Sequence, residues 1–253
     1  MARTHLVVAD AHSHPDFPNT RADWLSRLII DLRPDVVVNL GDDADMASIS
    51  AYDKGKRSFH GKSYRRDIDH HNDFQSRVWD PVKARKKRMP LRIICEGNHE
   101  HRIEKALDLS PELEGTLGFQ DFQYDEYYDE VVRYVGGTPG TINVDGLTYG
   151  HYLVSGVMGK PISGLHPAAM LNAKAHRSCV VGHIHTTDYS VSTMAGGVKI
   201  QSLVAPCFFD YDMDWAGAVN QLYSRGVVIL HDVEDGQYDP EWVSMNRLER
   251  YYS

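Results

Sequence analysis

VVVNLGDDAD, residues 36–45, is an apolar run that ends in a glycine and three aspartates. Valines and a leucine before a glycine predict a buried strand that ends in a sharp turn. Upstream, residues 21–32 place Trp24, Leu28 and other large apolar side chains on one helical face, and residues 5–9 form a short apolar run. A strand, a helix and a strand in this order predict a βαβ unit with parallel strands and a right-handed crossover.

The rest of the chain is richer in strands than in helices. Apolar runs predict further strands at 91–95, 147–151, 178–182, 189–194, 198–203 and 226–231, and helices over 101–109 and 165–175. A final hairpin is expected to turn at Asp235-Gly236 and to return through 241–245. This α/β mixture favours two packed sheets flanked by helices over a single open sheet.

Two segments interrupt the pattern. Residues 51–90 are expected to be an insertion in a single domain that spans residues 1–253, with a helix over 67–79 and a basic tail over 83–88. The insertion holds twelve of the 27 Lys and Arg residues against five Asp, although the chain has a net charge of −8. Residues 110–130 are acidic and aromatic and are expected to form a second excursion from the core.

Composition excludes several classes of protein. With 42% hydrophobic and 25% charged residues, the chain has the balance of a globular protein. No apolar run reaches the ~20 residues needed to cross a bilayer, so no membrane partner is expected, and the first residues lack the pattern of a signal peptide. The three cysteines are scattered, which predicts buried thiols in a reducing, cytoplasmic compartment.

Five short motifs carry the chemically useful side chains, and each follows an expected strand. They are D-x-H at 10–12, G-D-x-x-D at 41–45, G-N-H-E at 97–100, G-H at 150–151 and G-H-x-H at 182–185. Because the carboxyl ends of neighbouring strands meet at one edge of a sheet, we expect these motifs to converge. Their Asp, Asn and His side chains suffice to bind two divalent metal ions, an arrangement suited to displacing a leaving group from phosphorus.

In order and spacing, the five motifs resemble the signature of the calcineurin-like metallophosphoesterase superfamily, and the resemblance spans residues 10–185. It implies a four-layer α/β/β/α sandwich of two mixed sheets. It also implies two metal sites bridged by the carboxylate of Asp42. The remaining ligands that it implies are Asp10, His12 and His185 for one metal, and Asn98, His151 and His183 for the other.

The resemblance also implies a catalytic role for His99, which follows the expected ligand Asn98. In the family, a histidine here lies beside the phosphate and assists the departing oxygen, either by protonating it or as an imidazolium. The attacking group would be a hydroxide activated by the metal ions. Mixed Asp, Asn and His ligands favour Mn²⁺, with Fe or Zn²⁺ as alternatives. His14 is an alternative ligand to His12, and Asp45 is expected to orient a histidine or its own loop.

The substrate is less well defined by the sequence. Protein phosphatases of this family carry an arginine after the second aspartate block, whereas Met46 follows Asp45 here. Basic and aromatic residues are interleaved in the insertion, a mixture that can pair with phosphates and stack on bases. We therefore expect a phosphodiester of nucleotide or nucleic-acid type, with a phosphomonoester or a phosphoprotein as the alternative and a non-catalytic scaffold as a third hypothesis. The candidate substrate contacts are Arg102, Lys160, Arg65 and Arg66.

Overall fold

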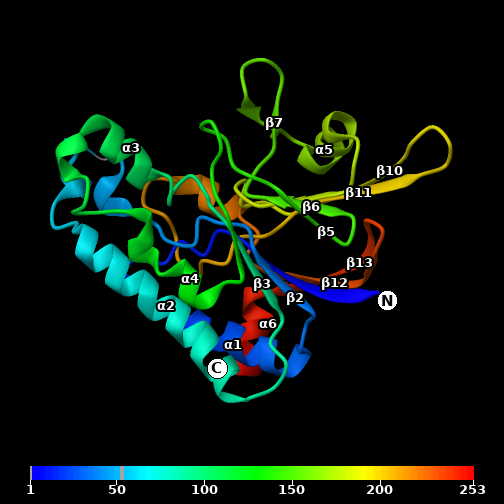
Figure 1. The fold of residues 1–253 in the computed structure, drawn as a ribbon, viewed down its shortest axis with the longest axis horizontal. Coiled ribbons are helices and arrows are strands. Elements are labelled where there is room, and N and C mark those ends of the chain that lie inside the picture. The colour runs from blue at the N-terminus through cyan, green and yellow to red at the C-terminus, as the bar shows by residue number, and fades with distance from the viewer. Residues whose placement is uncertain (1, 52–53) are drawn as a thin grey trace.

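Two β-sheets pack against each other in this computed structural model, and helices cover both outer faces (Figure 1). The structure describes residues 2–51 and 54–253, so residues 52 and 53 of the expected insertion lie outside the described part. Within those two ranges, no helix is both long and apolar enough to span a membrane.

The first sheet is mixed. Its inner strands are parallel and carry the N-terminal βαβ unit, whereas the two strands at its β13 edge are antiparallel. In spatial order the strands are β13 (Gln237–Ser244), β12 (Gly226–Glu234), β1 (Arg3–Val8), β2 (Val36–Asn39), β3 (Leu91–Cys95) and β4 (Glu130–Val132).

The second sheet is also mixed, with three parallel strands between two antiparallel edges. Its spatial order is β10 (Asp188–Thr193), β11 (Lys199–Val204), β9 (Cys179–Val181), β6 (Leu147–Gly150) and β5 (Ile142–Val144). A separate small hairpin, β7 (Val154–Ser155) with β8 (Lys160–Pro161), projects from the body of the molecule after β6 (Figure 1).

The helices form the outer layers. Three of them, α1 (Thr20–Leu32), α2 (Tyr64–Ala84) and α6 (Met245–Tyr252), pack on the outer face of the first sheet, and α5 (Pro167–Ala175) packs on the second (Figure 1). The shorter α3 (Arg102–Leu109) and α4 (Tyr124–Tyr127) lie beside the first sheet, with 3-10 turns at Ala47–Ile49, Arg57–Phe59, Pro111–Leu113, Phe119–Phe122 and Gly217–Leu222. The four-layer α/β/β/α fold that the family resemblance implied is confirmed.

Several boundaries differ from those expected. The helix expected over 67–79 extends over Tyr64–Ala84, because buried Val82 anchors a last turn beyond Pro81. Since α2 packs against α1 in the main core, this part of the expected insertion is integral to the fold. Residues 110–130 are not an excursion, since Tyr124 and Tyr128 are buried in that core. The final strand ends at Ser244, whose hydroxyl caps α6, a helix that we did not predict.

Candidate metal centre

The five motifs lie in the loops that follow β1, β2 and β3 of the first sheet and β6 and β9 of the second. Their loops turn sharply, because non-glycine residues adopt the left-handed backbone conformation there. The φ angles are 52° at Asp10, 42° at His12, 51° at Asp42, 70° at His183 and 64° at His185. Each such residue costs on the order of 1 kcal/mol, so surrounding contacts must hold these loops in place.

Two glycines allow the loops after β2 and β3 to touch through their backbones. A Cβ atom at Gly41 would lie 2.4 Å from the carbonyl oxygen of Cys95. A Cβ atom at Gly97 would lie 2.2 Å from the backbone nitrogen of Asp42. Because any side chain would collide with main chain at either position, glycine is required at both.

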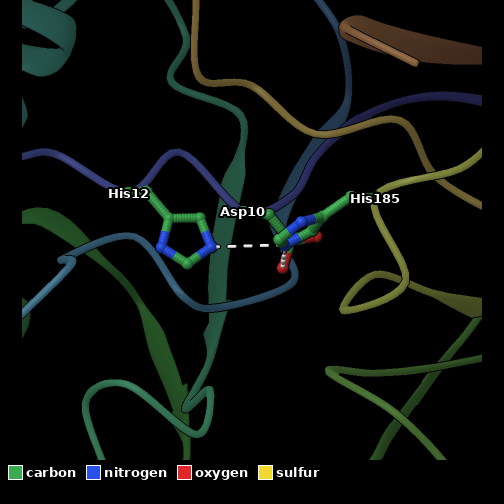
Figure 2. Close-up of side chains that lie close together, drawn as sticks. All are labelled: Asp10, His12 and His185. Atoms are coloured by element: carbon green, nitrogen blue, oxygen red, sulfur yellow. Dashed lines mark hydrogen bonds and ion pairs between the residues drawn. The ribbon is translucent and has the colours of Figure 1, made fainter. Parts of the chain in front are cut away.

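The first ligand cluster consists of Asp10, His12 and His185, whose ligand atoms all lie within 4.8 Å of one another (Figure 2). The Nε2 atom of His12 lies 3.3 Å from the Nε2 atom of His185. That same His185 nitrogen lies 3.5 Å from Oδ1 of Asp10. All three residues are buried, so a cation bound here would be largely shielded from solvent.

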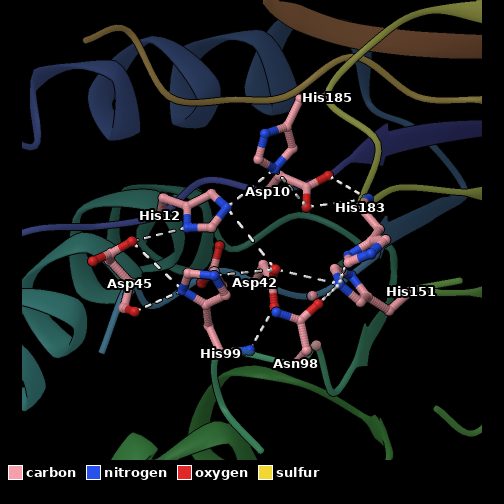
Figure 3. A network of polar contacts seen from close by, with 12 residues as sticks. Asp10, His12, Asp42, Asp45, Asn98, His99, His151, His183 and His185 are labelled. Atoms are coloured by element: carbon pink, nitrogen blue, oxygen red, sulfur yellow. Dashed lines mark hydrogen bonds and ion pairs between the residues drawn. The ribbon is translucent and has the colours of Figure 1, made fainter. Parts of the chain in front are cut away.

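The second cluster consists of Asp42, His151 and His183, with Asn98 beside them (Figure 3). The Nε2 atom of His151 lies 3.0 Å from Oδ1 of Asn98 and 3.2 Å from Nδ1 of His183. Asn98 and His183 are partly exposed, whereas Asp42 and His151 are buried. This side of the centre is therefore the one that solvent reaches.

Asp42 lies between the two clusters. Its Oδ2 atom is 3.3 Å from Nε2 of His151 and 3.9 Å from Nε2 of His12. The carboxylate thus faces one ligand of each cluster, which is the position that a bridging carboxylate requires (Figure 3).

The outer nitrogens of two histidines are fixed by acceptors. Nδ1 of His151 donates to the carbonyl oxygen of Leu40 at 2.9 Å, and Nδ1 of His12 lies 3.1 Å from Oδ1 of Asp45. With Nδ1 held as a donor, each ring turns Nε2 inward, toward another histidine nitrogen and a carboxylate, where loss of the Nε2 proton would leave a lone pair for a cation. Converging lone pairs and carboxylates of this kind fit divalent metal ions, and the Asp45 and Leu40 contacts are typical of support for metal ligands.

The electrostatics of the centre are dominated by opposite charges at short range. Burial by itself would raise the pKa of Asp42, but the neighbouring imidazole of His151 outweighs burial and holds the pKa of this carboxyl well below its ordinary value. Burial likewise lowers the pKa of His151, yet Asp42 outweighs burial and raises that pKa to about 9. The carboxylate is therefore ionised and ready to balance the charge of a cation.

His99 lies beside Asp42 and His12, and the ligand atoms of these three residues form a third group within 4.8 Å of one another. Two neighbours fix the ring of His99. Its Nδ1 atom donates to the carbonyl oxygen of Asp45 at 2.7 Å, and its Nε2 atom accepts from Arg102 at 3.1 Å. Burial lowers the pKa of His99 to about 3, and the charge of Asp42 does not offset this effect. In this geometry the ring is neutral rather than an imidazolium.

The structure brings the seven expected ligands together, and Arg102 lies with His99. The other expected substrate contacts lie farther out: Arg65 is exposed and pairs with Asp69, Arg66 pairs with Asp16, and Lys160 is exposed on β8. Residues 54–66, the part of the expected insertion in which basic and aromatic residues are interleaved, are called the basic segment below. Among its aromatic residues, the hydroxyl of Tyr64 donates to Asp121. His14, the alternative ligand, instead packs against the rings of Phe17 and Tyr211.

Two residues that we did not predict support the ligands. The hydroxyl of Tyr211 donates to the carbonyl oxygen of His12 at 2.6 Å. Glu100 accepts hydrogen bonds from the loop that carries Asp42. Because Glu100 belongs to the G-N-H-E motif, the sequence indicated that it lies near the ligands. No sequence pattern around Tyr211 indicates its hydrogen bond to His12.

No protein-family model matches the chain, and no curated protein matches it in sequence. Solved structures match over most of its length at low identity. A predicted phosphoesterase from Streptococcus pneumoniae is 11% identical over 96% of this chain and 99% of its own, with a TM-score of 0.34. A dimetal phosphatase from Danio rerio is 13% identical over 99% of both chains, with a TM-score of 0.42. A Pseudomonas putida nuclease is 14% identical over 94% of this chain and 87% of its own, with a TM-score of 0.38.

The order of the motifs, the sandwich of two mixed sheets and the paired ligand clusters at the strand ends agree with the fold and the site that the sequence resemblance implied.

Proposed function

We propose that this protein is a phosphoester hydrolase that uses two divalent metal ions, and that both are Mn²⁺. We further propose that its substrate is a phosphodiester of nucleotide or nucleic-acid type. The observation that carries the proposal is the position of Asp42, whose carboxylate faces both ligand clusters while His99 lies beside it. When bound, two such ions supply the Lewis acidity that activates water and offsets charge on the phosphoryl oxygens.

Each ligand has a role in this proposal. Asp10, His12 and His185 would hold one ion, Asn98, His151 and His183 would hold the other, and Asp42 would contribute to both. Asp45 orients His12 through its Nδ1 atom and so determines which ring nitrogen is free to bind.

His99 and Arg102 act together on the departing oxygen. The guanidinium of Arg102 donates to the carbonyl oxygen of Asp45 at 2.8 Å and to Nε2 of His99 at 3.1 Å. Arg102 therefore places a positive charge beside His99 and the centre, where it stabilises negative charge that develops as the ester bond breaks. Because Arg102 supplies the charge, His99 need not be an imidazolium.

The basic segment is the basis for the proposed substrate class. The start of α2 lies between two ligand loops, since Asp67 accepts from the backbone N–H of Ser48 at 2.9 Å and Arg66 pairs with Asp16 at 3.3 Å. Lys56, Arg57 and Arg65 are exposed in the same segment. In this proposal these exposed cations bind the backbone phosphates of a polymer that extends from the centre.

Two comparisons test this function. With Mn²⁺, bis-p-nitrophenyl phosphate should turn over faster than p-nitrophenyl phosphate. Faster cleavage of the monoester would instead favour a phosphomonoesterase or phosphoprotein phosphatase. No cleavage of either ester with any divalent metal ion would favour the non-catalytic scaffold.

The second comparison separates the basic segment from general charge effects. Replacing Lys56, Arg57 and Arg65 together by Ser should raise the KM for a single-stranded oligonucleotide on the order of tenfold. Replacing Arg85, Lys86 and Lys87 by Ser removes the same charge near the other end of α2, a helix of 21 residues and so about 30 Å long. This control should leave KM unchanged. Equal effects of the two variants would remove the segment from substrate recognition.

We also propose that the protein acts in the cytoplasm. Its three cysteines are buried and unpaired, which suits a reducing compartment.

A further inference from the structure

Glu100 is a fully buried carboxylate that accepts four backbone hydrogen bonds. Its Oε2 atom accepts from the N–H groups of Asp42 at 3.0 Å and Gly97 at 2.9 Å. Its Oε1 atom accepts from those of Asp43 at 2.7 Å and Ala44 at 2.9 Å. Three of the four donors are consecutive residues, so one side chain fixes the backbone of the whole Asp42 loop.

Three consecutive N–H groups converge in this way because Asp42 has a left-handed backbone, with a φ of 51°. Such a turn forms a concave set of donors that binds an anion. Here the anion is a side chain of the protein itself. The interaction also offsets the conformational cost of placing a non-glycine residue in the left-handed region.

The two loops hold each other reciprocally. While Glu100 accepts from the Asp42 loop, Oδ1 of Asp42 accepts from the backbone N–H of His99 at 2.8 Å. Oδ1 is thereby occupied, and Oδ2 is the oxygen that faces His151 and His12. The side chain of Asp42 is thus oriented from the G-N-H-E loop, which also carries Asn98 and His99.

We propose that Glu100 is a positioning residue for the metal centre, and that its contacts with the Asp42 loop set the affinity with which Asp42 and Asn98 bind metal. The inference rests on the proposed function and extends it to a residue that contacts no metal. It predicts that weakening the carboxylate's contacts with the backbone N–H groups of the Asp42 loop lowers metal affinity without changing any ligand.

The test compares Glu100→Gln with Tyr124→Phe and the wild type. Gln replaces one carboxylate oxygen by an NH₂ group, which faces backbone donors instead of accepting from them. Tyr124→Phe removes only the hydroxyl that donates to the same carboxylate at 3.3 Å, and it leaves the four backbone bonds in place. The measurements are the Mn²⁺ dissociation constants by calorimetry, and the melting temperature with and without Mn²⁺.

We expect Mn²⁺ to bind roughly 10- to 100-fold more weakly to Glu100→Gln, and the rise in melting temperature on adding Mn²⁺ to be smaller. Tyr124→Phe should behave like the wild type in both measurements. If Glu100 were only structural, the metal-free melting temperature would fall while the Mn²⁺ affinity and the Mn²⁺-induced rise stayed the same, and that result would overturn the inference. If Glu100→Gln does not fold, Glu100→Asp replaces it in the same measurements, because the shorter side chain moves the carboxylate oxygens away from the backbone donors by one methylene. A wild-type chain that bound no Mn²⁺ would overturn the proposed function as well, so the two failures are distinguishable.

Discussion

The carboxylate of Asp10 accepts the backbone N–H of His183, which lies 2.9 Å from Oδ2 and 3.1 Å from Oδ1. Asp10 follows a strand of the first sheet, and His183 follows a strand of the second. A single hydrogen-bonded contact therefore joins the two sheets at the centre, and it links an expected ligand of one metal to an expected ligand of the other. Displacing either sheet would alter both clusters at once.

Replacing Asp42 by Asn should abolish activity and leave the fold intact. The amide keeps the size of the side chain and an oxygen that can accept from His99, but it removes the charge shared between the clusters. We expect kcat/KM for bis-p-nitrophenyl phosphate to fall by at least about 100-fold, because loss of a supporting residue alone costs 10- to 100-fold. Circular dichroism checks the fold. Activity within tenfold of the wild type would rule out a mechanism with two metal ions.

Replacing His99 by Asn should separate catalysis from metal binding. The shorter amide can still donate to the carbonyl oxygen of Asp45, yet it cannot accept from Arg102 at the same place. We expect kcat to fall by roughly 10²- to 10³-fold, the range for loss of one group that stabilises negative charge in the transition state. Calorimetry with Mn²⁺ should show unchanged stoichiometry. A loss of bound metal would indicate that His99 is itself a ligand.

Replacing Asp45 by Asn tests the support of His12. The carboxylate that accepts from Nδ1 is lost, so the imidazole becomes a weaker and less well oriented ligand. We expect about 10- to 100-fold weaker Mn²⁺ binding at one site, measured by calorimetry. Asp16→Asn is the control, because Asp16 is an exposed carboxylate in the same region. Equal affinities in the two variants would contradict this role.

Stability should depend on pH through His71, which is buried in α2. Burial lowers the pKa of His71 from 6.5 to about 3. Between these values the unfolded chain binds a proton that the folded chain does not, so the free energy of unfolding falls as the pH falls below about 6.5. One such group accounts for about 2 kcal/mol between pH 7 and pH 5.

Urea denaturation at these two pH values, with EDTA present, checks the prediction. The wild type should lose about 2 kcal/mol more than His71→Gln, whose amide does not titrate. The comparison concerns the change with pH, so an overall loss of stability in the variant does not affect it. Equal losses in the two proteins would show that His71 is not the group responsible.

The parts of the fold with a strong local pattern were predictable from the sequence. The helix expected over 21–32 was found with only its first residue changed, since it begins at Thr20. It was predictable because the spacing of its apolar residues marks a single buried face. The strands that carry the motifs were also found, since each is a short apolar run before a glycine or a polar ligand. Local pattern was less informative at the ends of α2, where buried contacts with other elements extend the helix beyond its most regular part.

Features that depend on distant contacts could not be predicted. Tyr124 and Tyr128 have acidic neighbours in the sequence, which suggested a surface segment, but both are buried among residues of other elements. The sequence indicated only that Arg102 lies near His99. It could not indicate which atoms the guanidinium binds, because these depend on how the Asp45 loop folds. Likewise, the four donors to Glu100 are brought together only when the loops after β2 and β3 meet.

The backbone contact at Gly41 and Gly97 has a consequence for how such a centre evolves. Main-chain atoms, rather than side-chain volumes, set the spacing of the two loops there. A mutation at either glycine therefore meets an immediate steric barrier, whatever the neighbouring side chains are. Inheritance of the chemistry thus depends in part on two residues that have no functional group at all.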